Sequence, residues 1–322
     1  MSYLQNNRPG LRDLTNRTFQ AKDRMVTRST AKMVQEQPSL PQIQPSYQES
    51  DSKYDIDLPD KHDPLAVSDY VQEIYTYLKE LEVRFSAPTD YLDRQKEITA
   101  QMRMIVVDWL ADVHDRFHLQ HETFFLAVNY LDRFLSKKQV AKNKLQLVAL
   151  GSLFVAAKVE ESFAPYLRDL IQVTSAPFTP EQFIKLENVM LKTLEYNMFA
   201  TSSFAFLRRF TKIAQVDRTH KYTAHYLIEI SLLDSSYLEH RYSEIAAAAL
   251  KAAFEIHGVR SWPEALSRYS GFSEAQITPI AQKLVDSVRK LSKMRVKAVT
   301  KKYSSESYHR IATTVADRLN IV

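Results

Sequence analysis

Apolar residues recur at steps of three and four along most of the chain, a spacing that predicts helices. The segment from 102 to 117 shows one such stripe, formed by Met102, Ile105, Val106, Trp109, Leu110, Val113 and Phe117. A strand would instead alternate apolar and polar residues. Helix-forming residues dominate the proline-free stretches between Pro88 and Pro165 and between Pro180 and Pro263. No Asn-Gly or Asp-Gly hairpin turn occurs, so we predict an all-α fold.

An internal repeat predicts the architecture. The segments FTPEQF (178–183) and FSEAQI (272–277) lie 94 residues apart, and in each a hydroxyl residue precedes a Gln by three positions. This pattern is a capping box at a helix start, and the flanking apolar pair forms a hydrophobic staple. Helices of small residues, around 151–157 and 245–254, precede the two boxes. Small side chains let helices approach closely, so we expect two similar bundles in tandem, each around a central helix.

Lys158 and Glu187 lie at the ends of apolar stripes in the first copy of the repeat. The matching positions of the second copy fall near 252–254 and on Ala281, where we find no charged counterpart. The fold can therefore be built without these charges, which are costly in such places unless they pair or serve an interface. We interpret them as candidate binding residues, with two ordinary surface charges as the alternative.

Composition narrows the possible functions. The 322 residues include only four glycines, so no glycine-rich phosphate loop can be assembled. The absence of cysteine excludes disulfides and thiolate zinc sites and favours an intracellular protein. His114 and His118 share a helical face, but no HExxH pattern completes a metal site. No apolar run is long enough to span a membrane. We expect no catalytic residues, no cofactor and no metal.

The two ends of the chain carry unusual charge patterns. Residues 1–34 have a net charge of +5 and residues 35–64 of −5, and six of the twelve prolines fall within them. Such a segment cannot build a core, so we predict disorder from residue 1 to about 64. Eight basic residues and one acid lie between Arg289 and Arg310. They could form a nucleic-acid patch, but we favour the solvated face of a terminal helix because no recognition motif accompanies them.

Four long segments, in order, resemble the cyclin family. They are MRMIVVDWL (102–110), HETFFLAVNYLDRFL (121–135), KLQLVALGSLFVAAKVEE (144–161) and LENVMLKTLEYNM (186–198). The resemblance covers about residues 65–320, and FLRRFTKIAQVD (206–217) makes it most similar to the B-type mitotic cyclins. It implies three regions. Residues 1–64 would be a regulatory tail. Residues 65–199 would contain an N-terminal helix (66–83) and the first cyclin box, and residues 200–322 would contain the second box with a C-terminal helix or tail.

The resemblance also implies a function, that of a non-catalytic subunit that binds and activates a cyclin-dependent kinase at the G2/M transition, in the nucleus and cytoplasm. Lys158 and Glu187 match the charged pair with which the family hydrogen-bonds kinase backbone groups. The apolar surround of this pair is implied to comprise Tyr70, Ile74, Val159, Leu191, Tyr196 and Met198. Val159 departs from the aromatic residue that is common at its position.

Three further sites follow from the resemblance. A hydrophobic patch for substrates or inhibitors that contain Arg-x-Leu would comprise Met102, Ile105, Trp109, Asp112, Leu145 and Gln146. From periodicity alone, Met102 and Ile105 fit a core better. A phosphate pocket would comprise Arg208, Lys221 and His225. In the tail, RxxLxxLxN resembles the extended destruction box that the anaphase-promoting ubiquitin ligase captures, with Arg8, Leu11, Leu14 and Asn16.

Two other classes of protein stay open. A tandem helical fold of this kind also occurs in transcription-type cyclins and in transcription factor IIB-like proteins that contact DNA. A helical scaffold that does not bind a kinase is the third possibility. The destruction box and the FLRR segment favour the mitotic interpretation, in which nucleic acid is not an expected partner.

Overall fold

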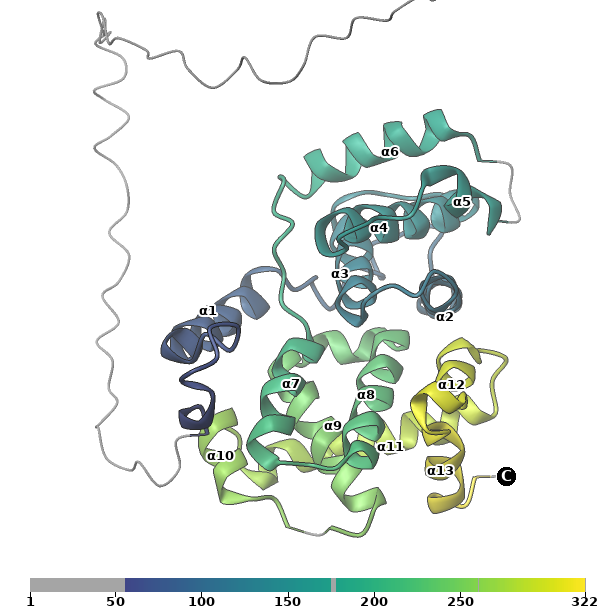
Figure 1. The fold of residues 1–322 in the computed structure, drawn as a ribbon. Coiled ribbons are helices and arrows are strands. Elements are labelled where there is room, and N and C mark those ends of the chain that lie inside the picture. Colours follow the sequence, from purple (N-terminus) through teal and green to yellow (C-terminus); the bar gives the residue numbers. More distant parts are fainter. Residues whose placement is uncertain (1–55, 175–177, 260, 322) are drawn as a thin grey trace, which may run out of the picture. The chain divides into compact units, whose positions relative to one another are not determined.

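The computed structural model describes residues 56–174, 178–259 and 261–321 (Figure 1). Across these segments the regular secondary structure is helical, and they contain no strand. The prediction of an all-α fold is confirmed.

The first bundle is built around one buried helix. Its members are α2 (Ala100–Arg116), α3 (His121–Lys137), α4 (Leu145–Glu160), α5 (Leu167–Gln172) and α6 (Pro180–Thr193). Helix α4 packs against α2, α3, α5 and α6 and is buried along nearly all of its length up to Ala157. The small-residue segment therefore forms the central helix, as predicted.

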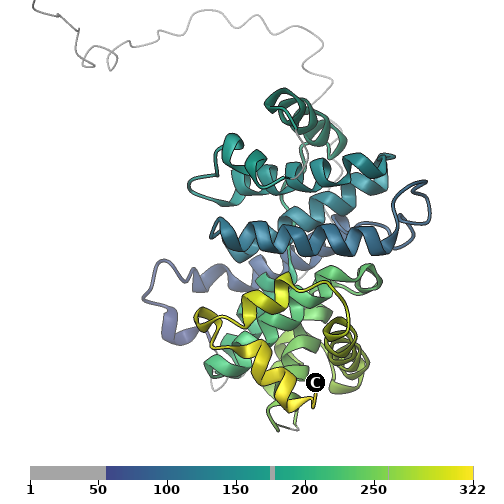
Figure 2. The ribbon, with the colours of Figure 1, turned by 90° about the vertical axis from the view of Figure 1, so that its right-hand side faces the viewer.

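The second bundle repeats this arrangement. It comprises α7 (Ser203–Ala214), α8 (Arg218–Leu233), α9 (Tyr242–Ile256), α10 (Glu264–Ser270) and α11 (Glu274–Ser292). The alanine-rich α9 contacts α7, α8 and α11 and is the buried centre. Two short helices follow, α12 (Ala298–Tyr303) and α13 (Ile311–Arg318) (Figure 2). Helix α13 packs against α8, and α12 contacts both α8 and α2 of the first bundle.

Both repeated helix starts carry the expected capping chemistry. In α6 the Thr179 side chain and the Gln182 side chain form a reciprocal capping box, and Ser273 and Gln276 do the same in α11. The rings of Phe178 and Phe183 lie 6.3 Å apart, as the staple requires. The two copies of the sequence repeat therefore form the same local structure.

Helix α1 (Val71–Arg84) begins later than expected, after a short 3₁₀ turn that contains Tyr70. It precedes the first bundle in sequence but is anchored on the second. The Glu82 carboxylate accepts hydrogen bonds of 2.8 Å from both the backbone N–H and the hydroxyl of Ser243, in the first turn of α9. A buried carboxylate at a helix N-terminus is favoured by the unpaired amides there.

The prediction of disorder up to residue 64 is wrong for its last part. Residues 58–60 form a 3₁₀ helix, and Asp57 is buried. Both Asp57 carboxylate oxygens accept from the guanidinium of Arg209, at 2.5 and 2.6 Å, and Lys212 also bonds Asp57. Burial by itself raises the pKa of Asp57, but the hydrogen bonds from Arg209 and Lys212 outweigh it and lower the pKa. This bidentate contact fixes the segment on α7.

The basic run between 289 and 310 is not one solvated face. Lys302 is buried and forms an ion pair with Glu229, while Arg310 pairs with Glu306 on the surface. The run therefore offers less exposed charge than its composition suggests. None of the helices in the described segments has the length and apolar character that crossing a bilayer requires.

Candidate protein-docking site

Lys158 and Glu187 meet on the surface of the first bundle. Lys158 is in the last turn of α4 and Glu187 is in the middle of α6, and Nζ of the lysine lies 2.6 Å from Oε1 of the glutamate. The lysine side chain remains 44% exposed and the glutamate side chain 20%. The Lys158 ammonium also lies 4.2 Å from the centre of the Phe154 ring. The two charges are thus held by each other while staying accessible to a partner.

A close approach of two helices creates this geometry. A Cβ atom at Gly151 would lie 2.6 Å from Cδ2 of Leu186, closer than atoms of this kind can pack. Gly151 is two helical turns before Lys158, and Leu186 adjoins Glu187. The absence of a side chain at Gly151 therefore lets α6 approach α4 closely enough for the charges to meet.

In the second bundle, the positions that correspond to Lys158 and Glu187 are buried. Ala252, Ala253, Phe254 and Ala281 are all buried. However, the expectation of no charged counterpart is only partly right, because Lys251 of α9 pairs with Glu274 of α11 at 2.5 Å. The Lys251 side chain is 2% exposed, whereas the Glu274 side chain is 48% exposed, so only the acid of this pair is accessible. What distinguishes the pair of the first bundle is that its cation, Lys158, is accessible too.

The predicted apolar surround is largely exposed. Tyr70, Ile74, Val159 and Tyr196 present their side chains to solvent, whereas Leu191 and Met198 are half-buried. Tyr196 follows the end of α6 in a left-handed conformation with φ of 56°. Non-glycine residues seldom adopt this conformation, which here turns the chain out of the helix. Val159 and Leu191 lie on the two helices that carry the charged pair, whereas Tyr70 and Ile74 lie at the start of α1. Exposed apolar and aromatic residues together with a charged pair are the composition of a protein interface.

Sequence reasoning missed two exposed aromatic residues that follow Lys158 closely in the chain. Phe163 is 93% exposed and Tyr166 is 71% exposed, in the segment that follows α4. The signal was available, since Phe163 and Tyr166 lie on either side of Pro165 shortly after the KVEE motif. We name the whole set the docking face, comprising Lys158, Glu187, Tyr70, Ile74, Val159, Phe163, Tyr166, Leu191, Tyr196 and Met198.

An acidic cleft of about 450 Å³ adjoins the docking face. Its lining includes Glu122, Glu160, Glu161 and Phe163, with Arg208 at one side. Burial raises the pKa of Glu160, and the neighbouring Glu122 and Glu161 raise it further. The guanidinium of Arg208 lies 3.3 Å from Glu122. The cleft would therefore favour a basic side chain of a partner.

The predicted patch on α2 is present in part. Ile105 is exposed, which excludes the core interpretation for it, and Met102 and Trp109 are half-buried. The Asp112 carboxylate is half-buried and bonds Arg116 at 2.9 Å. Gln146 is half-buried too. Leu145 does not fit the prediction, because it is 5% exposed and belongs to the core, where the first turn of α4 packs inward.

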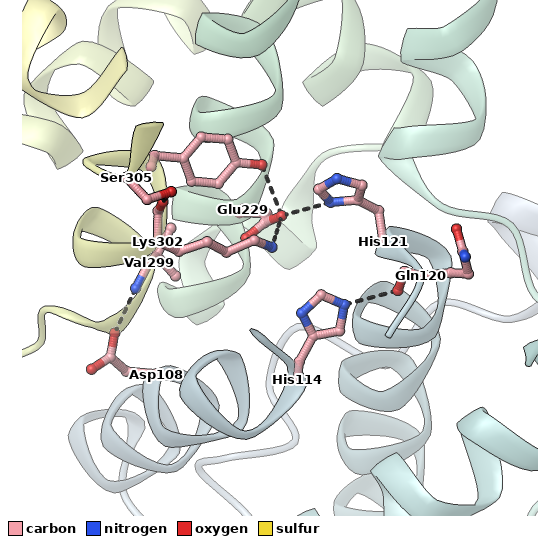
Figure 3. Close-up of polar contacts among 9 residues, drawn as sticks. Asp108, His114, Gln120, His121, Glu229, Val299, Lys302 and Ser305 are labelled. Carbon is pink, nitrogen blue, oxygen red and sulfur yellow. Dashed lines mark hydrogen bonds and ion pairs between the residues drawn. The ribbon is translucent and has the colours of Figure 1, made fainter. Parts of the chain in front are cut away.

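The C-terminal segment joins the two bundles through buried charges (Figure 3). The Asp108 carboxylate on α2 accepts from the N–H groups of Lys297 and Ala298 at the start of α12, at 3.0 and 2.9 Å. In α8, Glu229 accepts from Lys302 at 2.7 Å and lies 3.1 Å from Nδ1 of His121. Burial alone would raise the pKa of Glu229, but Lys302 and His121 outweigh it and lower the pKa.

The three residues of the predicted phosphate pocket have different surroundings. Arg208 is exposed and pairs with Glu122, and Lys221 is exposed. His225 is buried, with neither ring nitrogen hydrogen-bonded within the described part of the chain. Burial, with some help from neighbouring positive charge, lowers the pKa of His225 to about 3. The ring is neutral at ordinary pH, so it could offer a phosphate one N–H group but no positive charge.

The destruction-box residues Arg8, Leu11, Leu14 and Asn16 lie outside the described residues.

His114 and His118, considered above as metal ligands, do not point to one site. His114 is buried with Nε2 2.8 Å from the Gln120 carbonyl oxygen, and His118 is exposed.

Comparisons with known proteins agree with the tandem helical fold. The cyclin N-terminal domain family matches residues 73–199 and the cyclin C-terminal domain family matches residues 201–317. G2/mitotic-specific cyclin-1 of Medicago sativa subsp. varia is 36% identical, over 86% of this chain and 69% of the relative. G2/mitotic-specific cyclin-B of Patella vulgata is 40% identical, over 80% and 63%. Cyclin cdc13 of Schizosaccharomyces pombe is 39% identical, over 84% and 55%.

Solved structures show the same fold at lower identity. A viral cyclin from herpesvirus saimiri superimposes with a TM-score of 0.60 at 22% identity, covering 66% of this chain and 95% of the viral one. A chain of the yeast RNA polymerase II CTD kinase complex CTDK-1 gives 0.54 at 14% identity, covering 68% and 83%.

Two tandem helical bundles, with an exposed charged pair on the first, define the class, and the chain belongs to the cyclin family. Within that family it is similar to the G2/mitotic-specific B-type cyclins, at 35–41% identity over most of its length. It spans less than two thirds of the length of the Patella and Schizosaccharomyces relatives.

Proposed function

We propose that this chain is the regulatory subunit of a cyclin-dependent serine/threonine kinase that acts at the G2/M transition. Membership of the cyclin family and similarity to G2/mitotic-specific cyclins support the proposal. The observation that carries it is the Lys158–Glu187 pair, accessible on the surface and accompanied by exposed aromatic residues. Such a pair can exchange its internal ion pair for hydrogen bonds to a partner's backbone, while the aromatic residues supply the buried area.

Activation in this proposal is a shift of the kinase's conformational equilibrium. The chain binds the active arrangement of the kinase more tightly than the inactive one, and activation cannot exceed that difference in affinity. The phosphoryl-transfer chemistry belongs to the kinase. A rigid docking face serves this purpose, and the Gly151–Leu186 contact and the braced C-terminal segment supply rigidity.

Substrate recruitment and destruction complete the proposal. The exposed Ile105, with Met102, Trp109 and Gln146 beside it on the first bundle, would bind the leucine side of an Arg-x-Leu peptide. Asp112 would receive the arginine by exchanging its bond to Arg116. Arg8, Leu11, Leu14 and Asn16 would direct ubiquitin-mediated destruction through the anaphase-promoting ligase, and the protein would act in the nucleus and cytoplasm.

Reconstitution with a purified kinase subunit tests the proposal. The full chain is added to an unactivated cyclin-dependent kinase, and phosphorylation of a histone peptide is measured with and without it. We expect complex formation and a rise in activity that saturates at one chain per kinase. No increase with any cyclin-dependent kinase of the source organism would favour a scaffold, and sequence-selective DNA binding at physiological salt would favour the transcription class.

A further inference from the structure

A second cleft, on the first bundle and the end of α1, is lined mainly by basic and polar side chains. It encloses about 410 Å³. Its lining comprises Arg84, Phe85, Ser86, Pro88, Arg94, Arg133, Ser136, Lys137, Leu194, Glu195 and Asn197. Four of these residues are cations and one is an acid, so the cleft carries net positive charge. We name it the basic cleft, and none of its residues belongs to the docking face, the patch on α2 or the predicted phosphate pocket.

Arg133 is the buried element of the basic cleft. The residue is 7% exposed, yet it forms no ion pair with a carboxylate in the part of the chain that the structure describes. Its guanidinium donates to the side-chain oxygen of Asn129 at 3.2 Å and to the carbonyl oxygen of Asn197 at 3.0 Å. Burial lowers the pKa of Arg133, a sign that the charge is poorly compensated. A buried cation of this kind would be stabilised by an anion in the cleft.

Arg84 brings a second guanidinium to the same place. The guanidinium carbons of Arg84 and Arg133 lie 5.1 and 4.9 Å from the centre of one ring, that of Phe85. Arg84 is exposed, and its guanidinium has no ion-pair partner among the described residues. These two distances keep the guanidinium carbons no more than about 10 Å apart, and both residues line the basic cleft. Because Arg84 is exposed, its side chain can turn to share with Arg133 an anion that has several oxygens. Cation–π contacts with Phe85 orient them without neutralising them.

The remaining charges of the cleft are compensated. Arg94 pairs with Asp90 at 3.1 Å on the surface, and Lys137 pairs with Glu195 at 2.8 Å. Glu195 is the one acid in the lining and opposes an anion, although the hydrogen bond from Lys137 and its charge lower the pKa of Glu195. Release of Lys137 from Glu195 would add a third cation. The basic cleft thus contains two guanidinium groups without a carboxylate partner among the described residues, and one lysine that is paired with Glu195.

We propose that the basic cleft binds a phosphorylated serine or threonine side chain of a partner protein. Paired guanidinium groups match the several oxygens and the charge of nearly two on a phosphate monoester, and a single carboxylate satisfies them less well. The volume of the cleft admits the phosphate together with its side chain. This site would read the phosphorylation state of a partner, and the inference does not depend on the proposed function.

Fluorescence anisotropy with the full chain tests this proposal directly. The probe is a labelled peptide pool with phosphoserine at a fixed central position and random flanking residues, and the reference is the same pool without phosphate. Arg84→Gln removes the exposed guanidinium without leaving a buried charge. The matched control is Arg168→Gln, since Arg168 is 77% exposed and its guanidinium also lies 5.1 Å from an aromatic ring, that of Tyr166.

We expect the phosphorylated pool to bind more tightly than the reference pool. Arg84→Gln should weaken that binding about tenfold, the equivalent of one charge-assisted hydrogen bond, and Arg168→Gln should leave it within about twofold. Glu195→Gln should strengthen it, because it removes the opposing carboxylate and frees Lys137. This opposite sign cannot arise from misfolding.

Three results would overturn the proposal. Equal binding of the two pools would show that phosphate is not read. Equal losses in Arg84→Gln and Arg168→Gln would show a general attraction of anions to exposed arginines. Displacement of the labelled peptide by inorganic phosphate at the same concentration as by O-phosphoserine peptide would assign the cleft to a free anion.

Discussion

Replacement of Gly151 by alanine should disturb both the packing of the first bundle and the docking face. The added Cβ would lie 2.6 Å from Cδ2 and 3.3 Å from Cγ of Leu186. Relief requires α6 or the Leu186 side chain to move, and such overpacking costs about 1–3 kcal/mol. Alanine in place of glycine within a helix gains about 1 kcal/mol. The net loss of stability should be between zero and about 2 kcal/mol, with Glu187 displaced from Lys158.

A double-mutant cycle isolates the contact. Gly151→Ala, Leu186→Ala and the double variant are unfolded in urea, and kinase affinity is measured for each. Because Leu186→Ala makes room for the new methyl group, we expect the double variant to be more stable than the sum of the single changes by about 1–3 kcal/mol. Gly151→Ala alone should weaken kinase binding. Additive effects, or a Gly151→Ala variant that is more stable and binds normally, would refute the proposed close approach.

Three further predictions concern buried charge. Glu229→Gln should cost about 3–5 kcal/mol because it leaves Lys302 buried without a carboxylate; a change below about 1 kcal/mol in urea unfolding would argue against the ion pair. Asp57→Asn should expose residues 56–70 to limited proteolysis by removing the bidentate partner of Arg209, whereas an unchanged cleavage pattern would contradict the anchoring role. The third prediction is pH-dependent. Burial lowers the pKa of His225 from its ordinary 6.5 to about 3, so between these values the ring gains a proton only on unfolding. The free energy of unfolding should fall by about 1.4 kcal/mol per pH unit below pH 6.5 from this residue, and His225→Phe should reduce that slope by the same amount.

The sequence predicted features that depend on neighbouring residues. The capping boxes at Thr179 and Ser273 need side chains only three positions away, and the central helices need a run of small residues. These signals are local, so they can be read from residue order. The position of Gly151 within such a run also indicated a close helix contact, although the partner, Leu186, could not be named in advance.

Contacts between distant parts of the chain were missed. Asp57 lies in an acidic, proline-rich segment that is typical of disorder, yet Arg209, 152 positions away, holds it in place. Lys302 lies in a basic run, but the buried Glu229 compensates its charge. Leu145 matched a patch motif, although the register of α4 turns it into the core. For Asp57 and Lys302 the deciding partner lies far away in sequence, and composition carries no information about it.

The accessible pair provides the most direct test of the central claim. Kinase binding is measured by calorimetry for Lys158→Glu, for Glu187→Lys and for the double variant that carries both. The double variant can restore the internal ion pair of 2.6 Å with its charges exchanged, so its stability should be close to that of the parent chain. Its contacts to the kinase are not restored by this exchange. We therefore expect each of the three variants to lose at least about thirtyfold in affinity. Parental affinity in the double variant would show that the pair serves only to join α4 to α6, and would contradict the account.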